Sequence, residues 1–113
     1  MKEHDATTEH LIRCANRRLL FAVFGESYAS EDDDAEASEA LIDQMTLVLG
    51  SLTEREQRLI SNRFGVADGY AKSHTELAEI FGIDETQTRE IEIETMKKLR
   101  HPSRSLSLRE YLN

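Results

Sequence analysis

Apolar residues recur at helical spacing in the N-terminal part of the chain. The first such stretch runs from about Thr7 to Phe24, with apolar positions at Leu11, Ile12, Ala15, Leu19, Leu20, Val23 and Phe24. Arg13, Arg17 and Arg18 fall mainly on the other side. Apolar residues three and four positions apart share one face of a helix, so the pattern predicts an amphipathic helix, which Gly25 is suited to end.

A second helix is predicted from Ser38 to Leu49, ended by Gly50. Ser38 is a suitable N-cap residue. The apolar positions of this helix are Leu41, Ile42, Met45, Leu47, Val48 and Leu49.

Three later helices are each preceded by a capping signature, in which Thr, Ser or Asp is followed three residues on by Glu or Gln. The pairs are Thr53 with Glu56, Ser73 with Glu76, and Asp84 with Gln87. These helices should end at Phe64, Phe81 and Leu99. The short one carries Leu77, Ala78, Ile80 and Phe81. The last should bury Thr88, Ile91, Thr95, Met96 and Leu99 and stop at Pro102, followed by an amphipathic tail from Leu106 to Leu112.

Composition supports an all-α chain organised as a helical bundle. Of the 113 residues, 39% are hydrophobic, which suffices for one modest core, and there are only 5 Gly and 1 Pro. We expect residues 1–37 to form an N-terminal helix and an acidic linker, and residues 38–113 to form the domain. The run of Asp in the linker lacks the ligand spacing of a calcium loop, so it indicates a solvated segment. The first helix is expected to pack on its own domain, although pairing with a second copy is an alternative.

The distribution of charge divides the chain in two. Net charge is −8 overall, but residues 1–52 hold 4 basic and 11 acidic residues, whereas residues 53–113 hold 10 basic and 11 acidic. A free-standing DNA-binding protein usually has a basic footprint, because neutralising phosphates supplies much of its affinity. The chain as a whole has no such footprint, and the acidity of the first part indicates a separate role.

Other classes of function receive little support. Cys14 is the only cysteine, so no intramolecular disulfide can form. His4, His10 and Cys14 lack the spacing of a metal site, and we expect no metal and no cofactor. No arrangement typical of a catalytic site is present, so an enzyme is not expected. No apolar run approaches the length of a membrane span, and a cytoplasmic protein is expected.

The segment from Thr75 to Leu99 predicts a helix-turn-helix. A short helix, a turn containing Gly82 and a second helix entered by a polar cap form this arrangement. Ala78 is small where the two helices approach, and Ile83 can fill the turn. Helical hairpins of this kind also occur in proteins that never contact DNA, so the pattern alone does not establish DNA binding.

Several separated motifs, in order, resemble region 4 of the sigma-70 family of RNA polymerase sigma factors. They are residues 52–56 (LTERE), 62–66 (NRFGV), 76–83 (ELAEIFGI), 89–92 (REIE) and 97–105 (KKLRHPSRS). The last resembles the signature of primary sigma factors. The likeness covers about residues 40 to 112, and the chain shows no match to the regions that melt promoters or read the −10 element.

The resemblance implies two surfaces. Region 4 reads the −35 promoter element with its second helix, and it grips the flap-tip helix of the polymerase β subunit with another surface. The implied DNA-binding residues are Arg55, Arg63, Glu85, Thr86, Gln87, Arg89 and Glu90. Arg55 and Arg63 fall where family members touch phosphates, although they are equally compatible with solvated arginines. The implied polymerase-binding residues, most of which should also belong to the core, are Leu59, Ile60, Phe64, Met96 and Leu99.

The predicted reading face departs from the family pattern, which is rich in Arg, Gln and Lys. Its six positions hold Glu85, Thr86, Arg89, Glu90, Ile93 and Glu94, one basic residue against three acidic. Glu85 is placed four residues before Arg89 to form an intrahelical pair. Carboxylates facing phosphates lose the favourable release of counterions, so we expect weakened or altered −35 recognition. Ile93 should be exposed, either as an ordinary surface residue or as a contact with a protein.

Three hypotheses follow for function. In the first, the chain associates with RNA polymerase through the β flap and modulates transcription initiation. In the second, it is a conventional sequence-specific regulator, since Glu can accept from cytosine and Thr can touch the thymine methyl group. In the third, it mimics a sigma domain and binds a sigma-directed regulator. Sequence does not indicate the oligomeric state, the target promoters, or activation as opposed to repression.

Overall fold

The structure is a computed structural model that describes residues 6–25 and 36–112. Within these ranges the chain forms six α-helices and a short 3-10 helix, without strands, which confirms the all-α prediction. The helices are α1 (Ala6–Phe24), α2 (Glu39–Gly50), α3 (Glu54–Phe64), α4 (His74–Phe81), α5 (Glu85–Arg100), α6 (Pro102–Arg109) and the 3-10 helix η2 (Glu110–Leu112). None of the described helices is long and apolar enough to cross a membrane.

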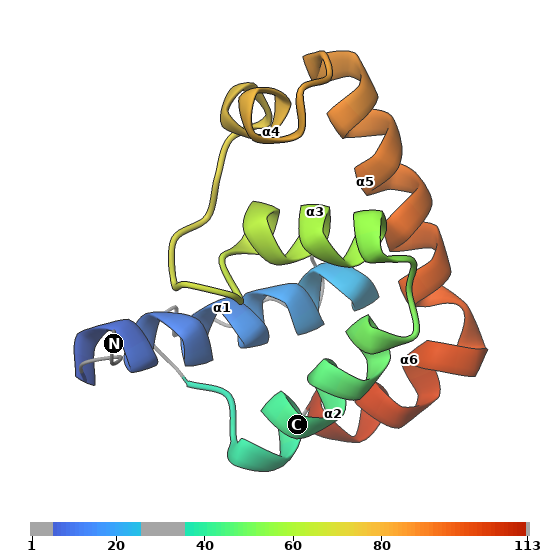
Figure 1. The fold of residues 1–113 in the computed structure, drawn as a ribbon. Helices are drawn as coiled ribbons and strands as arrows, with labels where there is room; N and C mark the ends of the chain where they lie inside the picture. The colour runs from blue at the N-terminus through green and yellow to red at the C-terminus, as the bar shows by residue number, and fades with distance from the viewer. Residues whose placement is uncertain (1–5, 26–35, 113) are drawn as a thin grey trace.

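Figure 1 shows how the helices are arranged. Helix α4 and the start of α5 lie at one end of the molecule, and α2 and α6 lie at the other. Helix α1 runs beside α3 between these ends, and it also packs against α2 and α5. The N-terminal helix is therefore an integral part of the bundle.

Local capping interactions determine where the helices begin. The Ser38 hydroxyl accepts a hydrogen bond from the amide of Leu41 (3.1 Å) and caps α2. The predicted capping boxes at Thr53, Ser73 and Asp84 are all present, each with reciprocal hydrogen bonds to the residue three positions on. Because these bonds span only three residues, sequence alone predicted the starts of four helices correctly.

A single apolar core joins α1 to the later helices. It contains Leu19, Leu20 and Val23 of α1 together with Leu41, Met45, Val48, Leu49, Leu52, Ile60, Met96, Leu99 and Leu108. The expectation that the first helix packs on its own chain is thus confirmed. The division into functional segments at residue 37 stays a prediction, and residues 26–35, most of the expected acidic linker, lie outside the described residues.

Two leucines and one isoleucine that we assigned to apolar faces are exposed instead. Leu47 of α2 is 69% exposed, Leu106 of α6 is 64% exposed and Ile80 of α4 is 47% exposed. In α2 the core takes up Leu41, Met45 and Val48, and at 100° per residue Leu47 points away from that side. Helical spacing identified the helix, but only packing selected which of its apolar residues are buried.

Pro102 begins a helix as well as ending one. His101 is extended, terminates α5 and accepts a hydrogen bond from the amide of Ser103 (3.1 Å) as the N-cap of α6. Proline suits the first helical position, because its missing N–H would have no helical partner there. The C-terminal helix therefore starts at Pro102, earlier than the predicted Leu106, and it buries Ser105 and Leu108.

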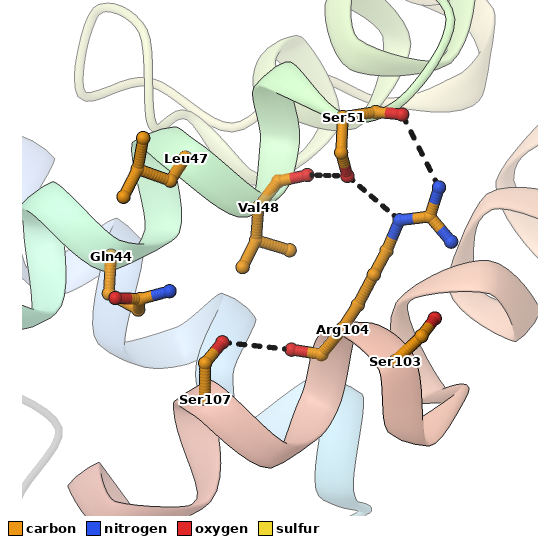
Figure 2. A pocket seen from close by; sticks show the side chains of 7 residues that line it. All are labelled: Gln44, Leu47, Val48, Ser51, Ser103, Arg104 and Ser107. Atoms are coloured by element: carbon orange, nitrogen blue, oxygen red, sulfur yellow. Dashed lines mark hydrogen bonds between the residues drawn. The ribbon is translucent and has the colours of Figure 1, made fainter.

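A hydrogen-bonded arginine holds α6 against α2 (Figure 2). The Nε of Arg104 donates to the Ser51 hydroxyl (2.8 Å), and its Nη2 donates to the Ser51 carbonyl (3.3 Å). The Ser51 hydroxyl in turn donates to the carbonyl of Val48 (2.6 Å). This chain of contacts fixes the C-terminal helix over the core, where Leu108 is fully buried.

Candidate nucleic-acid interface

Helices α4 and α5 form the helix-turn-helix that the sequence predicted. Gly82 has a φ of 67°, a left-handed conformation that favours glycine, and it ends α4. The amide of Ile83 then donates to the carbonyl of Ala78 (3.1 Å), which closes the turn. Asp84 caps α5 by accepting from the amide of Gln87 (2.8 Å). These three features set the direction in which α5 leaves the turn.

The outward face of α5 is the one predicted to read DNA. Thr86, Arg89, Glu90, Ile93 and Glu94 are exposed, and Glu85 is partly exposed. The opposite face of the helix is buried through Thr88, Thr95, Met96 and Leu99, as predicted, whereas Ile91 is only half-buried. Ile93 is 57% exposed among these charged side chains. The six outward residues therefore share one accessible surface.

The single arginine of this face is held by a carboxylate. Arg89 lies 3.7 Å from Glu85, which confirms the expected intrahelical pair. Glu85 also accepts a hydrogen bond from the Thr75 hydroxyl of α4 (2.6 Å), so its carboxylate bridges both helices of the motif. Further along, Glu94 lies 3.8 Å from Lys97. Two of the three carboxylates of the face, Glu85 and Glu94, thus have a partner close by.

The side chain of Gln87 is hydrogen-bonded to the backbone at the start of α5. Its side-chain oxygen accepts from the amide of Asp84 (3.1 Å) and completes the capping box. Contact between Gln87 and a base therefore requires its free amide hydrogens, since its oxygen is already engaged. The role of Gln87 in DNA binding stays a prediction.

The two arginines expected near phosphates differ in their surroundings. Arg55 is exposed near the start of α3, and it lines a shallow depression with Glu90, Ile91 and Glu94 of α5. Arg63 is instead engaged within the molecule. Its Nε donates to Glu92 (3.1 Å) and its Nη1 donates to the carbonyl of Lys72 (3.0 Å). Arg55 is therefore the better placed of the two for a phosphate.

Glu92 joins three elements of the domain. Its Oε1 contacts both the Nε of Arg63 from α3 and the Nε2 of His74 at the start of α4 (2.6 Å). The carboxylate is 22% exposed, so solvent screens these contacts only in part. Sequence reasoning did not identify this network. Its members lie 29 and 18 positions from Glu92, beyond the reach of any local pattern.

A second ion pair joins α3 to α5 beside the reading face. Lys98 lies 2.6 Å from Glu56, whose side chain is 12% exposed. Burial by itself would raise the pKa of Glu56, but hydrogen bonds from Lys98 and Thr53 outweigh it and hold this pKa below its usual range. Glu56 therefore contributes both to the cap of α3 and to the contact between the two helices.

The residues implied to bind polymerase lie inside the molecule. Leu59, Ile60 and Leu99 are 0% exposed, Met96 is 6% exposed and Phe64 is half-buried. Ile60, Met96 and Leu99 share the core with Leu19, Leu20 and Val23 of α1. In this conformation a partner has no direct access to Leu59, Ile60 or Leu99, because contacts within the chain already cover them.

Two of the three candidate metal residues, His10 and Cys14, lie close together on α1. His10 lies 3.6 Å from the Sγ of Cys14 and pairs with Glu36. His4 lies outside the described residues. Among the residues that the structure describes, no three His, Cys, Asp or Glu side chains are grouped so as to hold a metal ion.

The fold and the α4–α5 motif define a helix-turn-helix protein. The family described as sigma-70, region 4 matches residues 48–101, which include α3, α4 and α5. The chain is 43% identical over 79 residues to the RNA polymerase sigma factor SigA of Bacillus sp, covering 70% of this chain and 21% of the relative. It is 39% identical over 84 residues to SigA of Listeria monocytogenes, covering 74% of this chain and 22% of the relative.

The chain carries a sigma-70 region 4 domain. It spans about a fifth of the length of the curated relatives that it matches. Helix α1 lies outside the matched residues 48–101, as does most of α2. The reading helix lies within them, so its acidic outer face is a property of the region-4 domain itself.

Proposed function

We propose that this chain is a region-4 transcription factor that associates with RNA polymerase through the β flap and modulates transcription initiation. Its −35 recognition is weakened or altered. The observation that carries the proposal is the combination of a region-4 domain with an exposed, acidic reading face on α5. The region-4 fold is retained, but the charge of the reading face on α5 is acidic where the family pattern is basic. This combination supports polymerase as the main partner and promoter DNA as a weak one.

Electrostatics supports weak DNA recognition. Three carboxylates and one guanidinium lie on the outward face of α5, and Arg89 is paired with Glu85. The pair with Glu85 competes with a base for Arg89, and each carboxylate near the duplex repels phosphate. Arg55 supplies an exposed cation from α3 next to this face, and Glu90 and Glu94 line the same depression.

Ile93 supports a protein partner at the same face. An exposed isoleucine is ordinary by itself. Here it lies between Glu90 and Glu94 on a surface that sigma factors use for DNA, and it offers apolar area that a nucleic acid backbone does not require. The reading face is therefore suited to a basic protein surface more than to a duplex.

The proposal is tested by measuring binding of the whole chain to three immobilised targets by biolayer interferometry. The targets are the isolated β flap of a bacterial RNA polymerase, a duplex containing a −35 element and a duplex of scrambled sequence. We expect saturable binding to the flap and no preference between the duplexes at physiological ionic strength.

Two outcomes contradict this expectation. Salt-dependent binding to the −35 duplex, abolished by Arg89→Ala and without flap binding, would identify a conventional regulator. Binding to neither flap nor duplex, together with binding to an anti-sigma protein immobilised as a fourth target, would identify a sigma mimic. The variant Glu110→Ala, altered away from the reading face, is the control for general effects of charge.

A further inference from the structure

Helix α1 covers the apolar surface that our proposed function assigns to polymerase. Leu19 and Leu20 are completely buried and Val23 is 2% exposed. All three belong to the cluster that contains Ile60, Met96 and Leu99. The chain therefore already places a helix of its own on residues that a polymerase helix would have to contact.

Contacts outside the apolar cluster also hold the C-terminal end of α1. Near its C-terminus, the guanidinium of Arg100 donates to the carbonyl oxygens of Val23 and Ala22 (3.0 Å each). These carbonyls have no partner within the helix, so Arg100 acts as an external cap. Arg109 also lies over the ring of Phe24, 5.2 Å from its centroid.

The N-terminal half of α1 is held by a close approach of backbone. Gly69, in the loop between α3 and α4, lies so close that a Cβ built on it would be 2.8 Å from the Cβ of Leu11. Farther along, the carbonyl of Arg13 accepts from the amide of Ala37 (3.2 Å), where the chain returns toward α2. These contacts position the whole length of α1 along the domain.

We propose that α1 is an intrachain competitor that must leave this surface before the β-flap helix of RNA polymerase can bind. The inference rests on the proposed function. Helix α1 contacts this surface through two adjacent apolar residues and a third four positions after the first, namely Leu19, Leu20 and Val23. The incoming polymerase helix should present apolar residues at the same spacing. Arg100 would then be released to cap the carbonyl end of the incoming helix.

The competition has a quantitative consequence. A segment tethered by a short linker competes at an effective concentration on the order of millimolar. If α1 is docked in about 99 of 100 molecules, the apparent affinity for the flap falls about 100-fold, because only the open fraction can bind. The same contact keeps the apolar surface covered when polymerase is absent, which limits self-association.

The only cysteine of the chain reports the position of α1 directly. Cys14 lies on α1 and is 4% exposed, so a thiol reagent reaches it slowly while the helix is docked. The experiment follows labelling of Cys14 in the whole native chain as the isolated β flap, with its own cysteines replaced by serine, is titrated. We expect the labelling rate to rise at least tenfold and to saturate with flap occupancy.

Affinity for the flap provides the second measurement. Leu19→Ala and Val23→Ala remove contacts that only α1 supplies, so each should tighten flap binding by about tenfold or more. Arg18→Ala, at an exposed position of the same helix, is the matched control and should leave the affinity unchanged. Because Cys14 labelling uses the native chain, the test does not depend on how well the variants fold.

The outcomes separate this inference from the proposed function. One outcome would overturn the inference and leave the proposed function standing. In it, the native chain binds the flap while Cys14 stays protected from labelling, and neither Leu19→Ala nor Val23→Ala raises the affinity for the flap. No flap binding by the native chain or by either variant would overturn the proposed function. Labelling that depends on the concentration of the chain itself, with dimers in sedimentation, would show that a second copy displaces α1 and would also overturn the inference.

Discussion

Arg100 donates a hydrogen bond of 3.0 Å from its Nε to the carbonyl of Val23, 77 positions earlier in the chain. Arg100 ends the helix that carries the reading face, and Val23 lies in the last turn of α1. The contact therefore couples the N-terminal helix to the end of the region-4 match, which extends to residue 101.

Replacing Arg100 should loosen α1 selectively. Arg100→Ala removes the two hydrogen bonds to the end of α1, and we expect the free energy of unfolding to fall by about 1–2 kcal/mol. The rate of Cys14 labelling should rise by more than the lower free energy of unfolding accounts for, because the substitution frees the last turn of α1 first. Urea unfolding and labelling rates measure the two effects. Arg89→Ala, on the exposed face of the same helix, is the control, and equal labelling in both variants would contradict the prediction.

A substitution at Gly69 should force α1 away from the α3–α4 loop. Gly69 has a φ of 91°, and an added Cβ would meet Leu11 at 2.8 Å. Gly82 has a φ of 67° but open space around the same position. We expect Gly69→Ala to destabilise the protein by about 1–2 kcal/mol more than Gly82→Ala, since both variants carry backbone strain and only the first adds a clash. Thermal unfolding of both variants checks the difference, and equal losses would exclude the close approach.

Acid should weaken the contact between α3 and α5. The pKa of Glu56 is lowered in the folded chain, so its stabilisation is present above the usual pKa of a glutamate, about 4.3, and is lost as the pH falls through the lower folded value. Glu56→Gln keeps a side chain that can complete the capping box but loses the pair with Lys98. We expect Glu56→Gln to lower the free energy of unfolding by about 1 kcal/mol at pH 7. The difference from the native chain should shrink as the pH falls through the pKa of Glu56.

Unfolding by urea at a series of pH values tests this expectation. Glu54→Gln is the matched control, because Glu54 is an exposed first residue of the same helix. Glu54→Gln should lower the free energy of unfolding by a few tenths of a kcal/mol at most. A difference between native chain and Glu56→Gln that stays constant down to pH 2 would rule out the ion pair as its source.

Reversing charge on the reading face should create DNA binding. Glu85→Arg with Glu94→Lys adds four units of positive charge and releases Arg89 and Lys97 from their partners. We expect binding to a −35 duplex to strengthen by about tenfold or more at low salt, with a steeper salt dependence. Fluorescence anisotropy of a labelled duplex measures the change.

The control for charge reversal is Asp43→Lys with Glu110→Lys. These exposed residues lie on α2 and η2, at the end of the molecule away from the reading face (Figure 1), and their replacement adds the same charge. Equal strengthening by both double variants would show that total charge, and not the face, limits binding. Tight binding by the native chain would contradict the electrostatic argument altogether.

Sequence by itself determined the local structure of this protein. The starts of α2 to α5 follow from Ser38, Thr53, Ser73 and Asp84, because each cap acts on residues at most three positions away. The acidic reading face was also predictable, since helical periodicity places residues three and four apart on one side.

Only the tertiary structure decided which surfaces remain available. Arg63 was expected either near phosphate or in solvent and is instead engaged by Glu92 and the carbonyl of Lys72. Leu47 was assigned to the apolar positions of α2 and is exposed. The packing of α1 on its own domain was expected, but only the structure shows that its Leu19 and Leu20 share a cluster with Ile60, Met96 and Leu99. These outcomes depend on contacts between residues far apart in the chain, and no pattern within a single helix specifies which distant side chain will meet it.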